Sequence, residues 1–193
     1  MNPLLVLHEL GDERGGAAWR EALLRDGWDG AWSAPDQPGH ADAPWEADFY
    51  ESAHLVMAPL RHLLETGWRE RPVVVAVGHQ TAAAELLALG GKTAAIVLVD
   101  EPLAPQFATA QECQRAEYEW LRSLADDPDA QAAAPYGRTD PRTRHGLTPR
   151  HDPEYAERQR VAVPVPVLEL DEDDPAHVLS AVREWWASQP DDR

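Results

Sequence analysis

Short apolar runs, each about the length of one strand, recur along the chain and are separated by segments with helical spacing. The runs are residues 4–7, 31–33, 73–77, 95–99 and 161–170. Most of them are apolar at nearly every position, which is typical of strands buried on both faces of a parallel sheet. Strands that alternate with helices in this way predict an α/β fold, a three-layer sandwich with a mainly parallel sheet of about five strands.

The segments between these runs carry apolar residues at the spacing of one helix face. We expect the clearest stripe to face the core, and it consists of Phe49, Ala53, Val56, Leu60 and Leu64. Further helices are expected around Trp19 and Leu23 (ended by Gly27), at about 81–89, at about 109–124, and around Val178, Val182 and Trp185.

A chain of 193 residues is long enough for one domain with a substantial core and short for two. We therefore expect a single domain over residues 1–193. Within it, residues 102–160 have little periodicity beyond one helical pattern and are rich in Asp, Pro and Arg. This stretch is predicted to be an insert between the fourth strand and the fifth.

Acidic residues outnumber basic ones, with 34 Asp and Glu against 17 Lys and Arg, for a formal net charge of −17. A surface of this sign repels phosphate backbones and anionic lipids, so neither a nucleic acid nor a membrane is expected as a partner. No run approaches the ~18 apolar residues that a membrane-spanning helix needs, and no positively charged segment precedes the first apolar run. The sequence favours a cytoplasmic protein with a small-molecule ligand and leaves its oligomeric state open.

Metal and cofactor motifs are missing from the sequence. Cys113 is the single cysteine, which excludes an intrachain disulfide and a cysteine-based zinc cluster. His145 and His151 have no third ligand at a matching spacing, so no metal is expected. No GxGxxG or phosphate-binding loop occurs, and no cofactor is expected.

Residues that directly follow the strands are the first candidates for a ligand site. In open parallel sheets, ligands bind outside the carboxyl ends of the strands. The candidates are His8, Glu9, Gly78, His79, Asp100 and Glu101, with Asp36 and residues 171–174 at the two other exits.

Five motifs stand in order along the chain. They are Leu4–Gly11, Ala34–His40 (APDQPGH), Gly78–Ala82 (GHQTA), Ile96–Asp100 and Pro166–Pro175 (PVLELDEDDP). Together they resemble the α/β hydrolases, in which similar segments form an HGxG-type oxyanion loop, the APDLPGHG loop, the GHSxG nucleophile elbow, the next strand and the segment ending in the triad acid. The resemblance runs from residue 3 to about 187. It implies that residues 102–160 are a cap.

The resemblance places Gln80 at the nucleophile position, where the family has serine. A carboxamide has no oxygen that a histidine can turn into an attacking group, so the Ser-His-Asp mechanism is not expected. The backbone N–H groups of Leu10 and Thr81 correspond to the oxyanion hole, and the Thr81 side chain should point elsewhere. His79, beside the elbow, corresponds to a residue that packs near the sheet.

Glu9 is a second departure, because the family usually has glycine there. A carboxylate at this position opposes the negative charge that hydrolysis builds in an oxyanion hole. Its side chain either turns outward to solvent on a loop or takes part in the pocket.

Asp174 corresponds to the triad acid, but the helix and strand that precede the family's catalytic histidine have no counterpart. His177 follows three residues after Asp174, a spacing that allows contact within a helical turn. His177 is either the triad histidine brought to the acid by a deletion, or a solvent-facing residue of the last helix.

Three functions are compatible with these features. The leading one is a pseudo-hydrolase that binds a small organic or acyl-type ligand at the strand exits. The second is a noncanonical hydrolase, lyase or isomerase that uses His177 or Glu9 as a general base, with an oxyanion hole from Leu10 and Thr81. The third is an interaction module whose acidic surface docks a basic protein.

Overall fold

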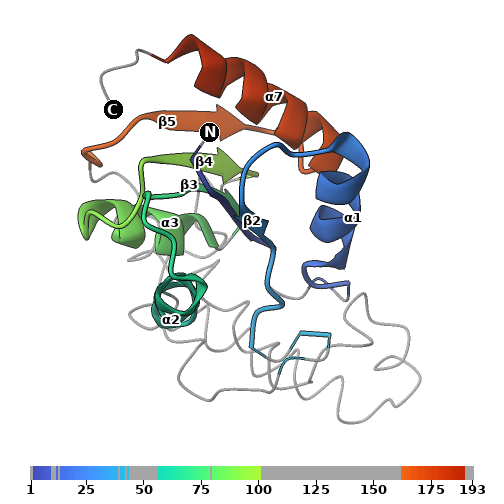
Figure 1. Cartoon of the computed structure of the whole chain (residues 1–193), viewed down its shortest axis with the longest axis horizontal. Coiled ribbons are helices and arrows are strands. Elements are labelled where there is room, and N and C mark those ends of the chain that lie inside the picture. The colour runs from blue at the N-terminus through green and yellow to red at the C-terminus, as the bar shows by residue number, and fades with distance from the viewer. Residues whose placement is uncertain are drawn as a thin grey trace, which may run out of the picture.

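The computed structural model describes residues 2–9, 12, 14–38, 40, 41, 43, 56–78, 80–100 and 162–189. Within these ranges, five parallel strands form one sheet in the order β2-β1-β3-β4-β5 (Figure 1). The strands are β1 (Leu4–Leu7), β2 (Trp32–Ser33), β3 (Val73–Val77), β4 (Ala95–Val99) and β5 (Val167–Leu170). The expected α/β class with a parallel sheet of about five strands is confirmed.

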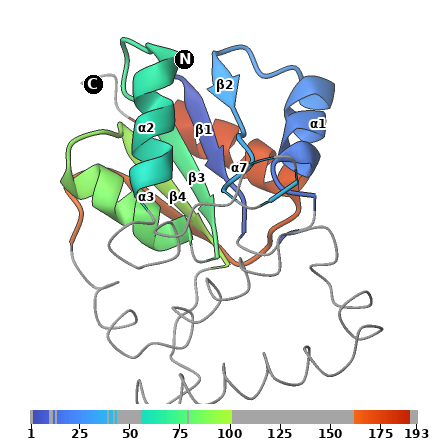
Figure 2. The same ribbon diagram turned by 90° about the horizontal axis from the view of Figure 1, so that it is seen from below.

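Helices cover both faces of this sheet, which gives the expected three layers. The described helices are α1 (Ala17–Asp26), α2 (Met57–Thr66), α3 (Gln80–Leu89) and α7 (Pro175–Ser188). Figures 1 and 2 show α1 beside α7 on one face, with α2 and α3 on the other. Gly27 ends α1 in the left-handed conformation, with φ 61°, as its position in the sequence predicts.

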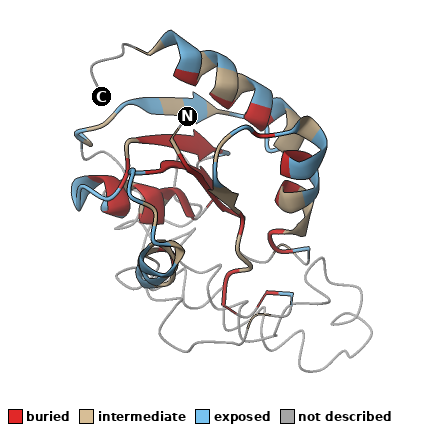
Figure 3. Cartoon of the chain, viewed as in Figure 1, coloured by how far each residue is buried: buried red, intermediate tan, exposed pale blue. Residues whose placement is uncertain are grey.

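The continuous apolar runs of the sequence are explained by burial on both faces of the sheet. Within β1, Leu4 and Val6 pack with residues of α1 and α7, whereas Leu5 and Leu7 pack with residues of α3. The strands β3 and β4 are buried along their whole length in the same way (Figure 3). These three central strands therefore separate two apolar layers and hold the fold together.

Two details of the sequence prediction are wrong. Leu64 is 76% exposed, whereas Leu60 and Leu63 pack against the core, so the stripe on α2 is rotated from the expected one. The last strand begins at Val167 rather than Val161, and its residues alternate between exposed and half-buried. It lies at the edge of the sheet, where an apolar run need not be buried on both sides.

Other predictions fall on parts of the chain outside the described residues. The insert at 102–160, its helix at about 109–124, and the start of the stripe at Phe49 and Ala53 belong to them. Among the helices that the structure does describe, none combines the length and apolar character needed to cross a membrane.

The two-sided burial of β1 predicts a large cost for removing a core side chain from it. Leu5 is 0% exposed, so Leu5→Ala should lower the free energy of unfolding by about 2–5 kcal/mol, through lost burial and the cavity left behind. Leu24 on α1 is 72% exposed, and Leu24→Ala serves as the matched control with a change within about 0.5 kcal/mol. Urea denaturation of both variants measures the difference, and equal losses would contradict the assigned core.

Candidate functional site

The exits of β1 and β3 lie side by side because these strands are neighbours in the sheet. The register of the two strands pairs Leu7 with Ala76. Two residues further along each strand, Glu9 therefore lies beside Gly78. The N–H of Gly78 donates to the carbonyl of Val99 over 2.8 Å, which ties the turn after β3 to the end of β4. Residues that stand about 70 positions apart in the sequence therefore meet at one edge of the sheet.

Gln80 is the first residue of α3 and is 0% exposed. Neither its Oε1 nor its Nε2 has a hydrogen-bond partner in the described part of the chain. A buried polar group without a partner costs about 1–3 kcal/mol, and Gln80 has one donor group and one acceptor in this state. The amide that the resemblance places at the nucleophile position thus has no hydrogen-bond partner within the described residues.

Glu9 points toward the turn after β3. Gly78 has φ +56°, and a Cβ added to it would collide with the Glu9 carboxylate. The side chain therefore lies against the Gly78 backbone, and Glu9 is half-buried. The absence of a side chain at Gly78 is what makes room for the carboxylate.

His8 joins the exit of β1 to the loop after β2. The backbone N–H of Gln37 donates to His8 Nε2 over 2.9 Å, and His8 Nδ1 lies 2.9 Å from the carbonyl oxygen of Glu9. Because Nε2 accepts, the proton is on Nδ1 and donates to that carbonyl. Both ring nitrogens of this fully buried histidine are thus used inside the protein.

Burial keeps the imidazoles of His8 and His40 uncharged. Burial first, and then the neighbouring His40, lower the pKa of His8 to about 3. The two rings form an edge contact with centroids 5.0 Å apart. Burial also lowers the pKa of His40, although the charge of Glu9 acts in the opposite direction. Both imidazoles are therefore neutral near pH 7.

Thr81 bonds within its own turn. Its Oγ1 donates to the Gly78 carbonyl over 2.7 Å, and its backbone N–H donates to the same carbonyl over 3.2 Å. The Thr81 N–H that the sequence predicts for an oxyanion hole therefore bonds within the turn. Leu10, His79 and Glu101, which the sequence also marked, lie outside the described residues.

Asp174 and His177 are in contact, but through the backbone. Asp174 caps α7, and its carboxylate accepts the His177 N–H over 3.0 Å. The His177 side chain is 57% exposed, and its Nε2 lies 3.8 Å from a Glu172 carboxylate oxygen. This imidazole faces solvent, in contrast to the fully buried Gln80. Asp100 is also exposed, at the end of β4 with φ 49°.

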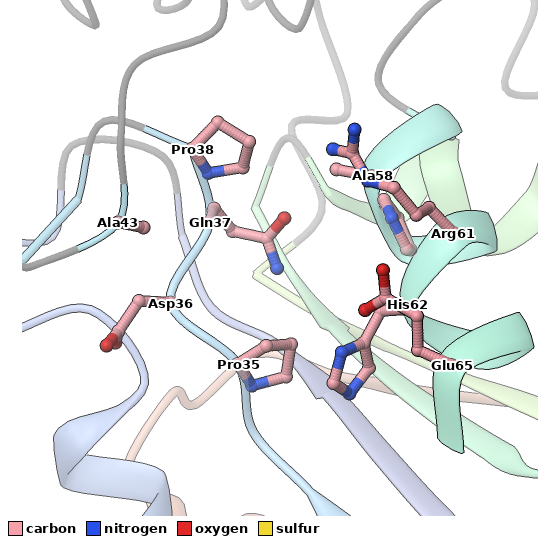
Figure 4. A pocket seen from close by; sticks show the side chains of 10 residues that line it. Pro35, Asp36, Gln37, Pro38, Ala43, Ala58, Arg61, His62 and Glu65 are labelled. Carbon is pink, nitrogen blue, oxygen red and sulfur yellow. The ribbon is translucent and has the colours of Figure 1, made fainter. Parts of the chain in front are cut away.

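A hollow of about 180 Å³ lies between the loop after β2 and helix α2 (Figure 4). Its lining mixes small apolar with polar and charged side chains: Pro35, Asp36, Gln37, Pro38, Ala43, Ala58, Pro59, Arg61, His62 and Glu65. The Asp36 carboxylate does not bond to residues that line the hollow in these contacts: it accepts a hydrogen bond from the Gly16 N–H and forms an ion pair with Arg20 at 3.1 Å.

Beside this hollow, Ser33 Oγ lies 2.8 Å from His62 Nε2. Neither residue is among the site candidates that the sequence predicts. They stand 29 positions apart and belong to no linear motif. The only sequence signal is a histidine within the apolar pattern of α2. Elsewhere in the described ranges, no group of three His, Cys, Asp or Glu side chains could hold a metal ion.

No family model and no curated protein matches this chain. Several solved structures do. The N-acyl homoserine lactonase AidH, complexed with N-butanoyl homoserine, has a TM-score of 0.65 at 14% identity, over 100% of this chain and 92% of that one. A thioesterase domain from the curacin biosynthetic pathway has a TM-score of 0.65 at 15% identity, over 96% and 90%. The bottromycin epimerase BotH, in complex with bottromycin A2, has a TM-score of 0.63 at 13% identity, over 96% and 89%.

At such identities these similarities establish the fold. The chain has the α/β-hydrolase fold, as its five motifs predicted.

The buried His8 predicts a loss of stability in acid. The folded protein keeps His8 neutral down to about pH 3, whereas the unfolded chain takes up the proton near pH 6.5. The unfolding free energy should therefore fall as the pH falls between these values, by up to about 1.4 kcal/mol per pH unit from this residue. His8→Gln should flatten the pH dependence measured by urea denaturation. His177→Gln, at an exposed histidine, is the control, and an unchanged slope in His8→Gln would contradict the assignment.

Proposed function

We propose that this protein is a hydrolase-fold binding protein: it holds a small organic or acyl-type ligand at the exits of β1 and β3 and does not cleave it by a Ser-His-Asp mechanism. The observation that carries the proposal is the buried Gln80 amide with both polar atoms unpaired. A ligand that offers an acceptor and a donor would remove the cost of leaving these groups without partners.

The chemistry of the surrounding residues supports binding without hydrolysis. The Gln80 carboxamide has no hydroxyl to acylate. The carboxylate of Glu9 lies against Gly78 at the start of the turn that resembles the nucleophile elbow, and a carboxylate beside an oxyanion hole would oppose acyl transfer. Such a site favours a neutral ligand, or one with N–H groups, over a carboxylate.

The acyl character of the ligand is proposed from the similar structures. One is complexed with N-butanoyl homoserine and another is a thioesterase domain. Amide and acyl groups both present a carbonyl oxygen that the Gln80 Nε2 can bind, and an amide adds an N–H for its Oε1.

Gln80→Met tests whether the amide is unpaired in the ligand-free protein. This change keeps the length of the side chain and removes its polar atoms, so the free energy of unfolding should rise by about 1–3 kcal/mol. The matched control is Thr81→Val, which removes a buried hydroxyl that does have a partner and should lower the stability. Thermal and urea denaturation measure both. Loss of stability in Gln80→Met would show that the amide is bonded within the protein.

Activated esters test the absence of elbow catalysis. Any turnover of nitrophenyl acetate or butyrate should be the same in the wild type and in Gln80→Ala, because residue 80 supplies no attacking atom. Rapid turnover that Gln80→Ala abolishes would overturn the proposal.

The position of Glu9 favours one alternative, an enzyme in which this carboxylate is the general base. It lies against the turn after β3, whereas the other candidate base, His177, is exposed at the start of α7. One similar structure is an epimerase, so the fold supports chemistry other than hydrolysis. A base at this position could take a proton from a substrate C–H or from water.

Proton exchange distinguishes this alternative from simple binding. If Glu9 is a base, incubation of N-butanoyl homoserine lactone with the protein in D₂O should incorporate deuterium at the α-carbon, visible by NMR. Glu9→Gln should slow that exchange at least about 100-fold, which is the usual contribution of a general base. Exchange at the same rate in Glu9→Gln and wild type would remove Glu9 from the reaction, and His177→Gln is the control.

A further inference from the structure

The hydroxyl of Ser33 contacts the imidazole of His62 on the face of the sheet that α2 covers. Neither residue is close to Gln80 in the sequence. Ser33 is the last residue of β2, and its register with Leu5 turns its side chain to the face that carries Leu5, Leu7 and α2. There its Oγ lies 2.8 Å from Nε2 of His62 on α2. Both residues are half-buried. This is the distance at which a histidine can take a proton from a serine hydroxyl.

The surroundings of His62 suit a proton acceptor. Burial lowers the pKa of His62, so its ring is neutral near pH 7 and Nε2 has a free lone pair when the proton is on Nδ1. Glu65, three residues further along α2, raises that pKa by its charge. A carboxylate near the ring stabilises the imidazolium that forms after proton transfer. Nucleophile, base and nearby acid are thus supplied by one strand end and one helix.

An adjoining hollow gives a small reagent access to the histidine. His62, Glu65 and Pro35 line the hollow of about 180 Å³, and Figure 4 shows the His62 ring facing Pro35 beside Glu65. Asp36 points away from His62 in this view, toward Arg20, with which it pairs. The hollow has room for a short acyl group beside His62, whose Nε2 contacts the Ser33 hydroxyl.

We propose that Ser33 and His62 form a reactive site, separate from the proposed binding site, that accepts small activated acyl or phosphonyl groups. The Ser33 Oγ attacks the carbonyl carbon while its proton passes to His62 Nε2. The bond to the leaving oxygen then breaks, and that oxygen takes the proton from His62. Water hydrolyses the Ser33 ester in the same way, with His62 as the base. The site shares no residue with the proposed ligand site at Gln80, and either can exist without the other.

A fluorophosphonate tests the proposal directly, because it phosphonylates a serine that an imidazole activates and releases fluoride. The 193-residue chain is incubated with the reagent, digested, and mapped by mass spectrometry. We expect a label on Ser33, and we expect its rate to fall at least about 100-fold in His62→Gln, since the amide cannot accept the proton. Ser180 is the internal control, as an exposed serine of α7 whose neighbour is Glu184 at 3.5 Å rather than a histidine. It should stay unlabelled.

The controls separate this site from the elbow and from a purely structural role. In the Gln80→Met variant, the fluorophosphonate should label Ser33 at the wild-type rate. The labelling result therefore does not depend on whether the proposed function at Gln80 is correct. If the contact only anchors α2 to the edge strand, Ser33 will be unlabelled, or labelled equally fast in His62→Gln, and either outcome overturns the proposal.

A second variant covers the case in which His62→Gln does not fold. Ser33→Cys retains the imidazole, and its thiol should react with iodoacetamide at least about tenfold faster than the thiol of Ser180→Cys, because a neighbouring histidine favours the thiolate. A rate at position 33 no higher than that at position 180 would overturn the proposal as well.

Discussion

Burial of the three central strands on both faces is the constraint on which the rest of the structure depends. Both faces of β1, β3 and β4 are buried, so these strands carry apolar side chains along their whole length. Polar residues follow only after each strand ends. The parallel arrangement brings those ends to one edge of the sheet. Glu9, Gly78 and Gln80 meet there as a consequence of strand order. His8 holds this edge of the sheet in place, because its two ring nitrogens form hydrogen bonds that join the end of β1 to the loop after β2.

Two residues at this edge carry the proposed function. Gln80 has a buried amide whose polar atoms lack a hydrogen-bond partner within the described residues, and the carboxylate of Glu9 lies against Gly78. In the proposal, this amide stands in place of an attacking hydroxyl, and the ligand is a neutral, hydrogen-bonding group. The protein retains the α/β-hydrolase scaffold, and the proposed function follows from the residues placed on it.

Much of the fold could be predicted from the sequence, because continuous apolar runs and glycine-ended helices are local signals. Leu4–Leu7, Val73–Val77 and Ala95–Val99 are the strands that their composition predicts, and Gly27 is the expected cap. The rotation of α2 could not be predicted, since several apolar stripes fit residues 56–64 and tertiary packing selects among them. The inward placement of Glu9 depends on the missing side chain of Gly78. The Ser33–His62 contact depends on how an edge strand and a helix pack, and no spacing in the sequence encodes it.

The most direct test is a high-resolution crystal structure of the protein as purified, inspected at the two polar atoms of the Gln80 side chain. The account predicts an organic molecule, or ordered water in its place, within hydrogen-bonding distance of both Oε1 and Nε2, with the Glu9 carboxylate still against Gly78. Hydrogen bonds from both atoms to groups of the protein itself would contradict it, because the amide would then be a satisfied part of the core.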